Sequence, residues 1–187
     1  SQLIPVSLVD QGGMEMVYHA KTLIHGALLG VCLALLIYNT GLYRTLRDPA
    51  YAYYSLYLCA TFFVLAGMTG IGMTTLWPGN IWLSNKGMLF WGAVGKVLAV
   101  QFSRRFLDSR ELPFLNWLLQ ATMVVALAYV AASLLLPPFE AFRLATLFLF
   151  VFPAFFFLAG LIALKRHRRQ ARFYILGQGA SWLGLVL

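Results

Sequence analysis

The chain is dominated by apolar stretches that run for about 20 residues with few or no charges. From residue 22 to residue 43, for example, there is no Asp, Glu, Lys or Arg. A helix of this length crosses the hydrocarbon core of a bilayer, which is about 30 Å thick. Of the 187 residues, 61% are hydrophobic and 11% are charged, whereas a soluble domain has roughly 45–50% and about 25%. We therefore predict an all-α fold, a polytopic transmembrane helical bundle.

The breaks between these stretches divide the chain into six expected spans. Residues 1–21 are mixed in polarity and contain a Gly-Gly pair, so we interpret them as an extracytoplasmic tail or linker. The transmembrane domain is expected to cover 22–187, with spans at about 22–43, 49–71, 81–103, 113–136, 141–164 and 173–187. The last span would measure only about 22 Å at a rise of 1.5 Å per residue, so we expect it to be incomplete at Leu187.

Positive charge is concentrated in alternate connections between the spans. The chain has 14 Lys and Arg against 6 Asp and Glu, a net charge of +8. Ten of the 14 follow the first, third and fifth spans: Arg44, Arg47, Arg104, Arg105, Arg110, Lys165, Arg166, Arg168, Arg169 and Arg172. The positive-inside rule places these connections in the cytoplasm and the N-terminus outside. Because the basic residues flank apolar spans, we expect them to contact anionic lipid headgroups of the bilayer and not nucleic acid.

Two polar residues lie inside the expected spans. Lys96 is an intramembrane cation, and such residues are costly and often functional. It is eight residues from Arg104, however, so we favour a side chain that snorkels toward the cytoplasmic interface or bonds a carbonyl. A polar functional role is the alternative. Asn39, near the inner end of the first span, is predicted to form a hydrogen bond between helices.

Small residues recur at helical spacing in two spans. Gly26, Gly30 and Ala34 share one face of the first span, and the third span carries Gly92, Gly95 and Ala99 in the same way. Such stripes let two helix backbones approach closely. We favour packing within the bundle, with dimerisation as the alternative.

No residue pattern indicates catalysis or a bound cofactor. The sequence has no paired carboxylates, no Ser/His/Asp arrangement and no phosphate-binding glycine loop. We therefore predict no catalytic site, no cofactor-binding site and no metal site. Cys32 and Cys59 both fall in apolar stretches and are expected to be free thiols. An outer-leaflet pocket near His25, Trp77, Asn85 and Trp91 is a further hypothesis.

Three connections resemble a known family. The stretches "YNTGLYRTLRDPAYAYYSLY" (38–57), "QFSRRFLDSRELPFLNWLL" (101–119) and "RHRRQARFYILG" (166–177) are similar to the membrane domain of the bacterial seven-transmembrane receptors with diverse intracellular signalling modules. The likeness extends over about 35–180. The residues that match the family pattern are Asn39, Arg47, Asp48, Tyr51, Tyr54, Phe106, Leu107, Asp108, Ser109, Arg110, Pro113, Ala171 and Arg172.

The resemblance implies an architecture and a function. Members of the family typically join an extracytoplasmic, carbohydrate-binding-like domain to seven spans and a cytoplasmic effector, which is a histidine kinase, a diguanylate cyclase, another cyclase or a phosphatase. The six spans of this chain would then be part of seven, in the inner membrane of a bacterium. Any ligand would act from the extracytoplasmic side, and kinase or cyclase effectors would form a homodimer. The catalytic activity would belong to the effector, and this segment would be non-catalytic.

In that interpretation, the cytoplasmic connections couple the bundle to the effector. The candidate coupling and topology residues are Arg47, Asp48, Arg104, Arg105, Asp108, Arg110 and Arg172. Reversing the charge of Arg110 and Arg172 should change effector output without preventing membrane insertion. A subunit or fragment of a transporter or channel is the alternative function, with Pro153 and Lys96 as its only candidate hallmarks. A structural scaffold is a third.

Overall fold

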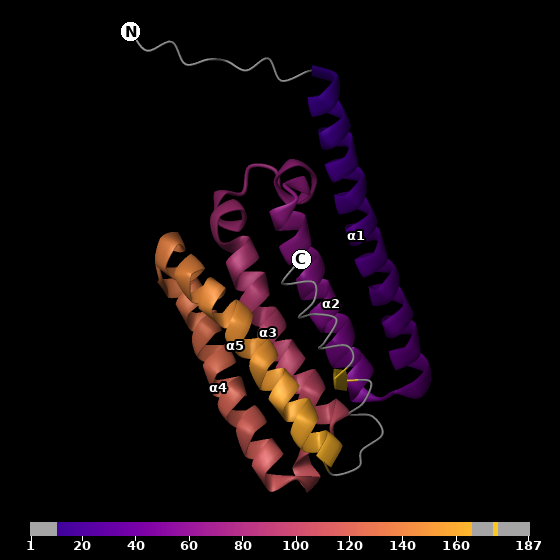
Figure 1. The fold of residues 1–187 in the computed structure, drawn as a ribbon, viewed down its shortest axis with the longest axis vertical. Helices are drawn as coiled ribbons and strands as arrows, with labels where there is room; N and C mark the ends of the chain where they lie inside the picture. Colours follow the sequence, from indigo (N-terminus) through magenta and orange to yellow (C-terminus); the bar gives the residue numbers. More distant parts are fainter. Residues whose placement is uncertain (1–10, 166–173, 176–187) are drawn as a thin grey trace.

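The computed structural model describes residues 11–165 together with 174 and 175, and Figure 1 shows their arrangement. The described residues contain helices and turns and no strand. Five α-helices make up most of this part: α1 (Gln11–Leu46), α2 (Pro49–Met68), α3 (Met88–Phe106), α4 (Pro113–Leu135) and α5 (Pro138–Lys165). Two short π-helices, η1 (Gly72–Leu76) and η2 (Leu83–Gly87), lie between α2 and α3, and a 3-10 helix, η3 (Ser109–Glu111), precedes α4. The predicted all-α fold is confirmed.

Successive helices run in opposite directions. The α1–α2 turn, the α3–α4 turn and the last residue of α5 lie at one end of the bundle, whereas the α2–α3 and α4–α5 connections lie at the other (Figure 1). We call the first the basic end, because Arg44, Arg47, Arg104 and Arg105 fall there. The alternation that placed these arginines on one side is therefore present in the structure.

Prolines mark the starts of three helices. Pro49, Pro113 and Pro138 each stand in the first turn of a helix, where the missing N–H would have had no partner and the fixed φ suits the helix. The break expected at 137–140 is consequently shorter than predicted, and α5 begins at Pro138 and not at 141. Asp48 precedes α2 as its N-cap, and its carboxylate accepts a 2.9 Å hydrogen bond from the N–H of Ala50.

Four helices are long and apolar enough to cross a membrane: Thr22–Leu46, Pro49–Met68, Pro113–Leu135 and Pro138–Leu164. By length and composition, these four helices correspond to the stretches predicted as spans at 22–43, 49–71, 113–136 and 141–164. The span predicted at 81–103 is not among the four. The regular α-helix in this region, α3, starts only at Met88, after η2. This helix contains three cations: Lys96, Arg104 and Arg105. The span predicted at 173–187 lies outside the described residues apart from Tyr174 and Ile175, and α1 begins at Gln11, within the segment interpreted as a linker.

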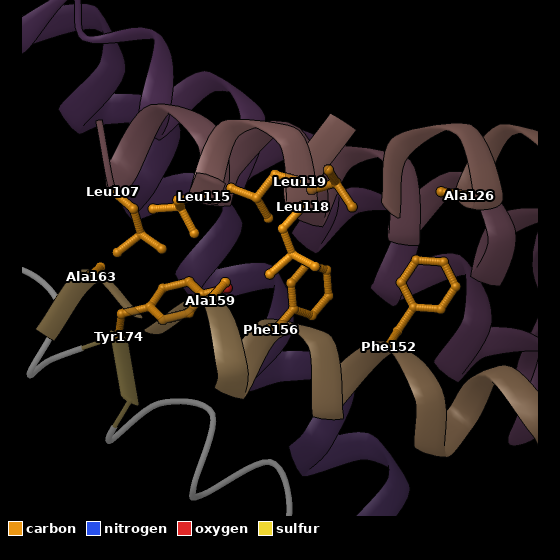
Figure 2. Packing of buried hydrophobic residues seen from close by; sticks show 11 residues of the cluster. Leu107, Leu115, Leu118, Leu119, Ala126, Phe152, Phe156, Ala159, Ala163 and Tyr174 are labelled. Atoms are coloured by element: carbon orange, nitrogen blue, oxygen red, sulfur yellow. The ribbon is translucent and has the colours of Figure 1, made fainter. Parts of the chain in front are cut away.

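The main core lies between α3, α4 and α5. Figure 2 shows leucines of α4 facing Phe156 and Tyr174. Phe152 of α5 and Val100 of α3 belong to the same cluster. Phe152 is 1% exposed and Val100 is fully buried. Because α3 packs against α2 as well as α4 and α5, protein surrounds it on several sides. Because its neighbours shield it, α3 can belong to the bundle although it is the least apolar of the long helices.

Candidate functional site

A polar pocket lies at the basic end, where α1 ends, α2 begins and α3 ends. Its volume is about 450 Å³, and we call it the basic-end pocket. Four residues predicted to be functional line it: Asn39, Asp48, Arg105 and Asp108. The remaining lining residues are Pro49, Ala50, Tyr51, Tyr54, Phe102 and Phe106. Three helices thus bring together residues that are up to 69 positions apart (108 − 39) in the sequence.

Asn39 and Asp48 are held in place by local hydrogen bonds. The Asn39 side chain is 7% exposed, and its Nδ2 donates to the carbonyl of Leu35, 2.8 Å away on the same helix. The hydrogen bond that the structure shows for Asn39 therefore lies within α1, whereas the sequence predicted one between helices. The carboxylate of Asp48 caps α2 while it lines the pocket. Local hydrogen bonds thus orient both side chains at the pocket.

The two turns beside the pocket have left-handed residues. Arg47, with φ of 53°, ends α1, and its N–H donates to the carbonyl of Tyr43 at 2.8 Å. Asp108, with φ of 47°, follows α3. Glycine is the usual residue where a helix ends in this conformation. Residues other than glycine, such as Arg47, are uncommon there. Of these two left-handed residues, Asp108 lines the pocket, whereas Arg47 does not.

An aromatic series links the pocket to Tyr174. The rings of Tyr54 and Phe102 are 5.2 Å apart, those of Phe102 and Phe106 are 5.1 Å apart, and those of Phe106 and Tyr174 are 6.2 Å apart. The hydroxyl groups of Ser103 and Tyr174 form a buried hydrogen bond of 2.7 Å. Sequence analysis missed both residues. A buried tyrosine usually finds a hydrogen-bond partner. The position of Tyr174 in an apolar stretch could therefore have indicated a polar partner on another helix.

The other predicted coupling residues are divided among different places. Arg104 donates to Oδ1 of Asn116 at 3.4 Å and so joins α3 to α4. Arg105 is exposed at the pocket rim, and Arg47 is exposed at its turn. Arg110 belongs to η3, and Arg172 lies outside the described residues. The pocket therefore unites Asp48, Arg105 and Asp108 of the predicted set.

Comparison with known families gives one match. The model of the family described as 7TM diverse intracellular signalling matches residues 21–187. The chain belongs to this family. Searches of curated proteins and of solved structures gave no match. The resemblance seen over about 35–180 is thereby confirmed and extended to almost the whole chain, which is a multi-pass sensory membrane module of the 7TM diverse intracellular signalling family.

Lys96 has an aromatic neighbour in this family member. Its Nζ lies 5.8 Å from the centre of the Phe152 ring of α5, within the range of a cation–π contact. The sequence did not predict this partner, because a residue on α3 and a residue on α5 meet only through the packing of the two helices. The contact supplies an electrostatic partner for a cation in the apolar core.

The residues of the predicted outer-leaflet pocket separate into two groups. Trp77 and Asn85 line a common pocket at the end opposite the basic end. Trp91 does not line it but stacks on Phe63, with ring centres 4.6 Å apart. His25 lies half-buried on α1 and is not a lining residue either. Only half of the predicted set therefore shares a pocket.

Lys86 is an interaction residue that sequence analysis overlooked. Its Nζ donates to the carbonyls of Leu134 (2.8 Å) and Leu136 (2.9 Å) at the end of α4. The last carbonyls of a helix lack helical partners, and a cation there also interacts favourably with the helix dipole. Lys86 thus joins η2 to the C-terminus of α4.

The two small-residue stripes have different surroundings. A Cβ added at Gly95 would lie 3.7 Å from the Cβ of Ala60, so the stripe on α3 packs against α2 as predicted. A Cβ at Gly26 or Gly30 would meet nothing within 4 Å. Packing of the α1 stripe within the bundle is therefore wrong for the described residues, because α1 contacts α2 through its other face, with Leu29 and Cys32 buried.

The two cysteines do not form a disulfide with each other in the part of the chain that the structure describes. Cys32 and Cys59 are free thiols. The thiol of Cys32 donates a hydrogen bond to the carbonyl of Leu58, at an S···O distance of 3.5 Å. Within the described ranges, no group of three or more His, Cys, Asp or Glu side chains could hold a metal ion.

Proposed function

We propose that this chain is the transmembrane transducer of a bacterial signalling receptor in the inner membrane. It would relay an extracytoplasmic stimulus to a cytoplasmic effector, a histidine kinase or a diguanylate cyclase. The observation that carries the proposal is the match of residues 21–187 to a family of intracellular signalling. The effector would supply the catalytic activity and the contacts of a homodimer.

The orientation follows from charge. Arg44, Arg47, Arg104 and Arg105 share the basic end, and short connections rich in Lys and Arg stay in the cytoplasm. In this orientation the basic end contacts anionic headgroups and faces the effector, and the N-terminus is outside. The basic-end pocket then opens toward the cytoplasm.

The pocket is suited to report helix movement. Asn39, Asp48 and Arg105 belong to α1, the start of α2 and α3 respectively. A small shift of one helix changes the distances between these polar groups and therefore the free energy of each arrangement. A stimulus that favours one arrangement shifts the population of the effector states by its differential affinity for them.

The test uses the receptor with its effector in bacterial membranes. We expect Arg105→Glu to change kinase or cyclase output about 5-fold or more, the lower range of allosteric coupling, while the amount of membrane-inserted protein stays unchanged. The matched control is Arg143→Glu, a charge reversal at the opposite end, where Arg143 is exposed. Charge reversal at Arg110 and Arg172 is expected to act like that at Arg105.

Three results would oppose the proposal. Equal output from Arg105→Glu and wild-type receptors would remove the pocket from signalling. Reporter fusions that place the basic end outside would reverse the orientation. Solute flux through vesicles that contain the purified protein, without any signalling output, would favour a transporter or channel.

A further inference from the structure

The basic-end pocket contains charges of both signs that are not paired with each other. Its lining includes two carboxylates, Asp48 and Asp108, and one guanidinium, Arg105. Within the described part of the chain, Asp48 and Arg105 form no salt bridge with each other, although both line this cavity. An anion and a cation that share a cavity but stay apart leave room for a ligand that carries both signs of charge.

Asn39 presents an unused acceptor to the same cavity. The side chain is 7% exposed and lines the pocket. Because Nδ2 donates to the carbonyl of Leu35, the amide cannot turn over without placing oxygen against oxygen, so the position of Oδ1 is fixed. Among the described residues, the buried side-chain atoms without a partner are Nε1 of Trp77 and Oγ of Ser109. Oδ1 of Asn39 accepts no hydrogen bond and is not one of these atoms, so it is accessible to a donor in the pocket.

Aromatic rings make up much of the remaining wall. Tyr51, Tyr54, Phe102 and Phe106 line the pocket, and the ring centres of Tyr54 and Phe102 are 5.2 Å apart. The face of an aromatic ring attracts a cation that lies within about 6 Å of its centre. Carboxylates, an amide oxygen and aromatic rings together favour an ammonium group, whereas a guanidinium favours a phosphate. The lining is therefore complementary to a zwitterion with an ammonium and a phosphate.

The pocket lies at the level of lipid headgroups. The helices Thr22–Leu46 and Pro49–Met68 are long and apolar enough to cross a membrane, and Asp48 stands in the turn between them. Headgroups occupy the layer just beyond the hydrocarbon core. Near this turn, Tyr43 and Leu46 of α1 are 42% and 56% exposed, and tyrosines at the end of a span typically lie at the membrane interface. A phospholipid can therefore place its headgroup in the pocket while its acyl chains stay in the bilayer.

We propose that the basic-end pocket binds the zwitterionic headgroup of an aminophospholipid. The primary ammonium donates to Oδ1 of Asn39 and to the carboxylate of Asp48 and lies against the aromatic rings, and the phosphate accepts from Arg105. A quaternary ammonium has no N–H to donate, so Asn39 selects ethanolamine over choline. The headgroup thereby joins α1, the start of α2 and α3, and the consequence of this link for signalling rests on the function proposed above.

The experiment measures lipid binding to the purified, delipidated chain in detergent by native mass spectrometry. The probes are dihexanoyl phosphatidylethanolamine and dihexanoyl phosphatidylcholine, which differ only in methylation of the nitrogen. We expect the ethanolamine lipid to bind roughly 3- to 15-fold more tightly, the range that corresponds to one hydrogen bond inside a membrane protein. Phosphoethanolamine without acyl chains should displace the lipid only weakly. Displacement at the same concentration as the lipid would assign the site to a soluble zwitterion and overturn the assignment to a lipid.

Variants test the two charged parts of the headgroup separately. Asn39→Leu should abolish the preference for ethanolamine over choline, whereas the control Asn116→Leu, which lies outside the pocket, should keep it. Arg105→Gln should weaken both lipids alike, by up to about 5-fold as for an exposed ion pair, because both carry the phosphate. Arg44→Gln, at the same end but outside the lining, should weaken neither. Asp48→Asn keeps a good N-cap residue and should weaken both ammonium lipids but not phosphatidylglycerol.

Three outcomes overturn the proposal. Equal affinity for the ethanolamine and choline lipids in the wild-type chain would exclude donation from the ammonium to Asn39. A preference that persists in Asn39→Leu would exclude the amide as its source. Equal losses in Arg105→Gln and Arg44→Gln would show general attraction to the basic end and no phosphate site. Because binding is measured without an effector, a receptor that binds the lipid but keeps its output in Arg105→Glu would refute the proposed signalling function and not this inference.

Discussion

Replacement of Lys86 by methionine removes a cation of η2 that caps the C-terminus of α4. In the folded protein, Nζ of Lys86 donates to the carbonyls of Leu134 and Leu136 at 2.8 and 2.9 Å. Each hydrogen bond contributes a net free energy of about 0.5–1.5 kcal/mol, and a cation at a helix C-terminus contributes about 0.3–1 kcal/mol. Lys86 is half-exposed, so water compensates part of the loss. We expect Lys86→Met to lower the free energy of unfolding by about 1–2 kcal/mol, a factor of roughly 5–30 in the folded-to-unfolded ratio.

The assay is equilibrium unfolding in mixed micelles, followed by helical circular dichroism as the denaturing detergent is increased. Lys86→Arg keeps a donor cation and should recover most of the lost stability. Arg143→Met removes a cation at the same end of the bundle, but its ion pair with Glu140 is 3.8 Å long and exposed, so it should change stability by less than about 1 kcal/mol. If Lys86→Met costs no more than Arg143→Met, the two hydrogen bonds do not hold η2 to α4 and the reasoning is refuted.

Three further predictions concern a hydrogen-bonded pair and two glycines. A double-mutant cycle of Ser103→Ala and Tyr174→Phe, measured by the same unfolding assay, should give a coupling energy of about 0.6–1.7 kcal/mol for the hydroxyl pair; additive effects would mean that the bond is not formed. Gly72→Ala should destabilise the protein by about 1–3 kcal/mol, because the added methyl overlaps the indole of Trp77. Gly26→Ala should be neutral or stabilising by up to about 1 kcal/mol, since the added methyl would meet none of the described residues within 4 Å, and a loss of stability there would indicate a partner on that face.

The sequence by itself determined the class of fold and most of its divisions. Runs of about 20 apolar residues cannot dissolve in water and match the thickness of a bilayer, so four of the expected spans appear as helices of the right length and composition. Prolines 49, 113 and 138 and the acidic residue Asp48 mark helix starts for reasons that operate within one turn of chain. The alternation of basic connections follows from the same divisions. These are local properties, and a sequence carries them directly.

The tertiary structure decided which faces and which distant residues meet. The small-residue stripes on α1 and α3 look alike in sequence, yet Gly95 packs on Ala60, whereas a Cβ added at Gly26 or Gly30 would meet none of the described residues within 4 Å. Helical periodicity defines a face of a helix but does not specify the neighbour that covers it. For the same reason, the partners of Lys86 and Lys96 could only be identified once the helices were packed. The basic-end pocket exists because the ends of three helices converge there, and that convergence depends on packing between helices and not on the order of residues along any one of them.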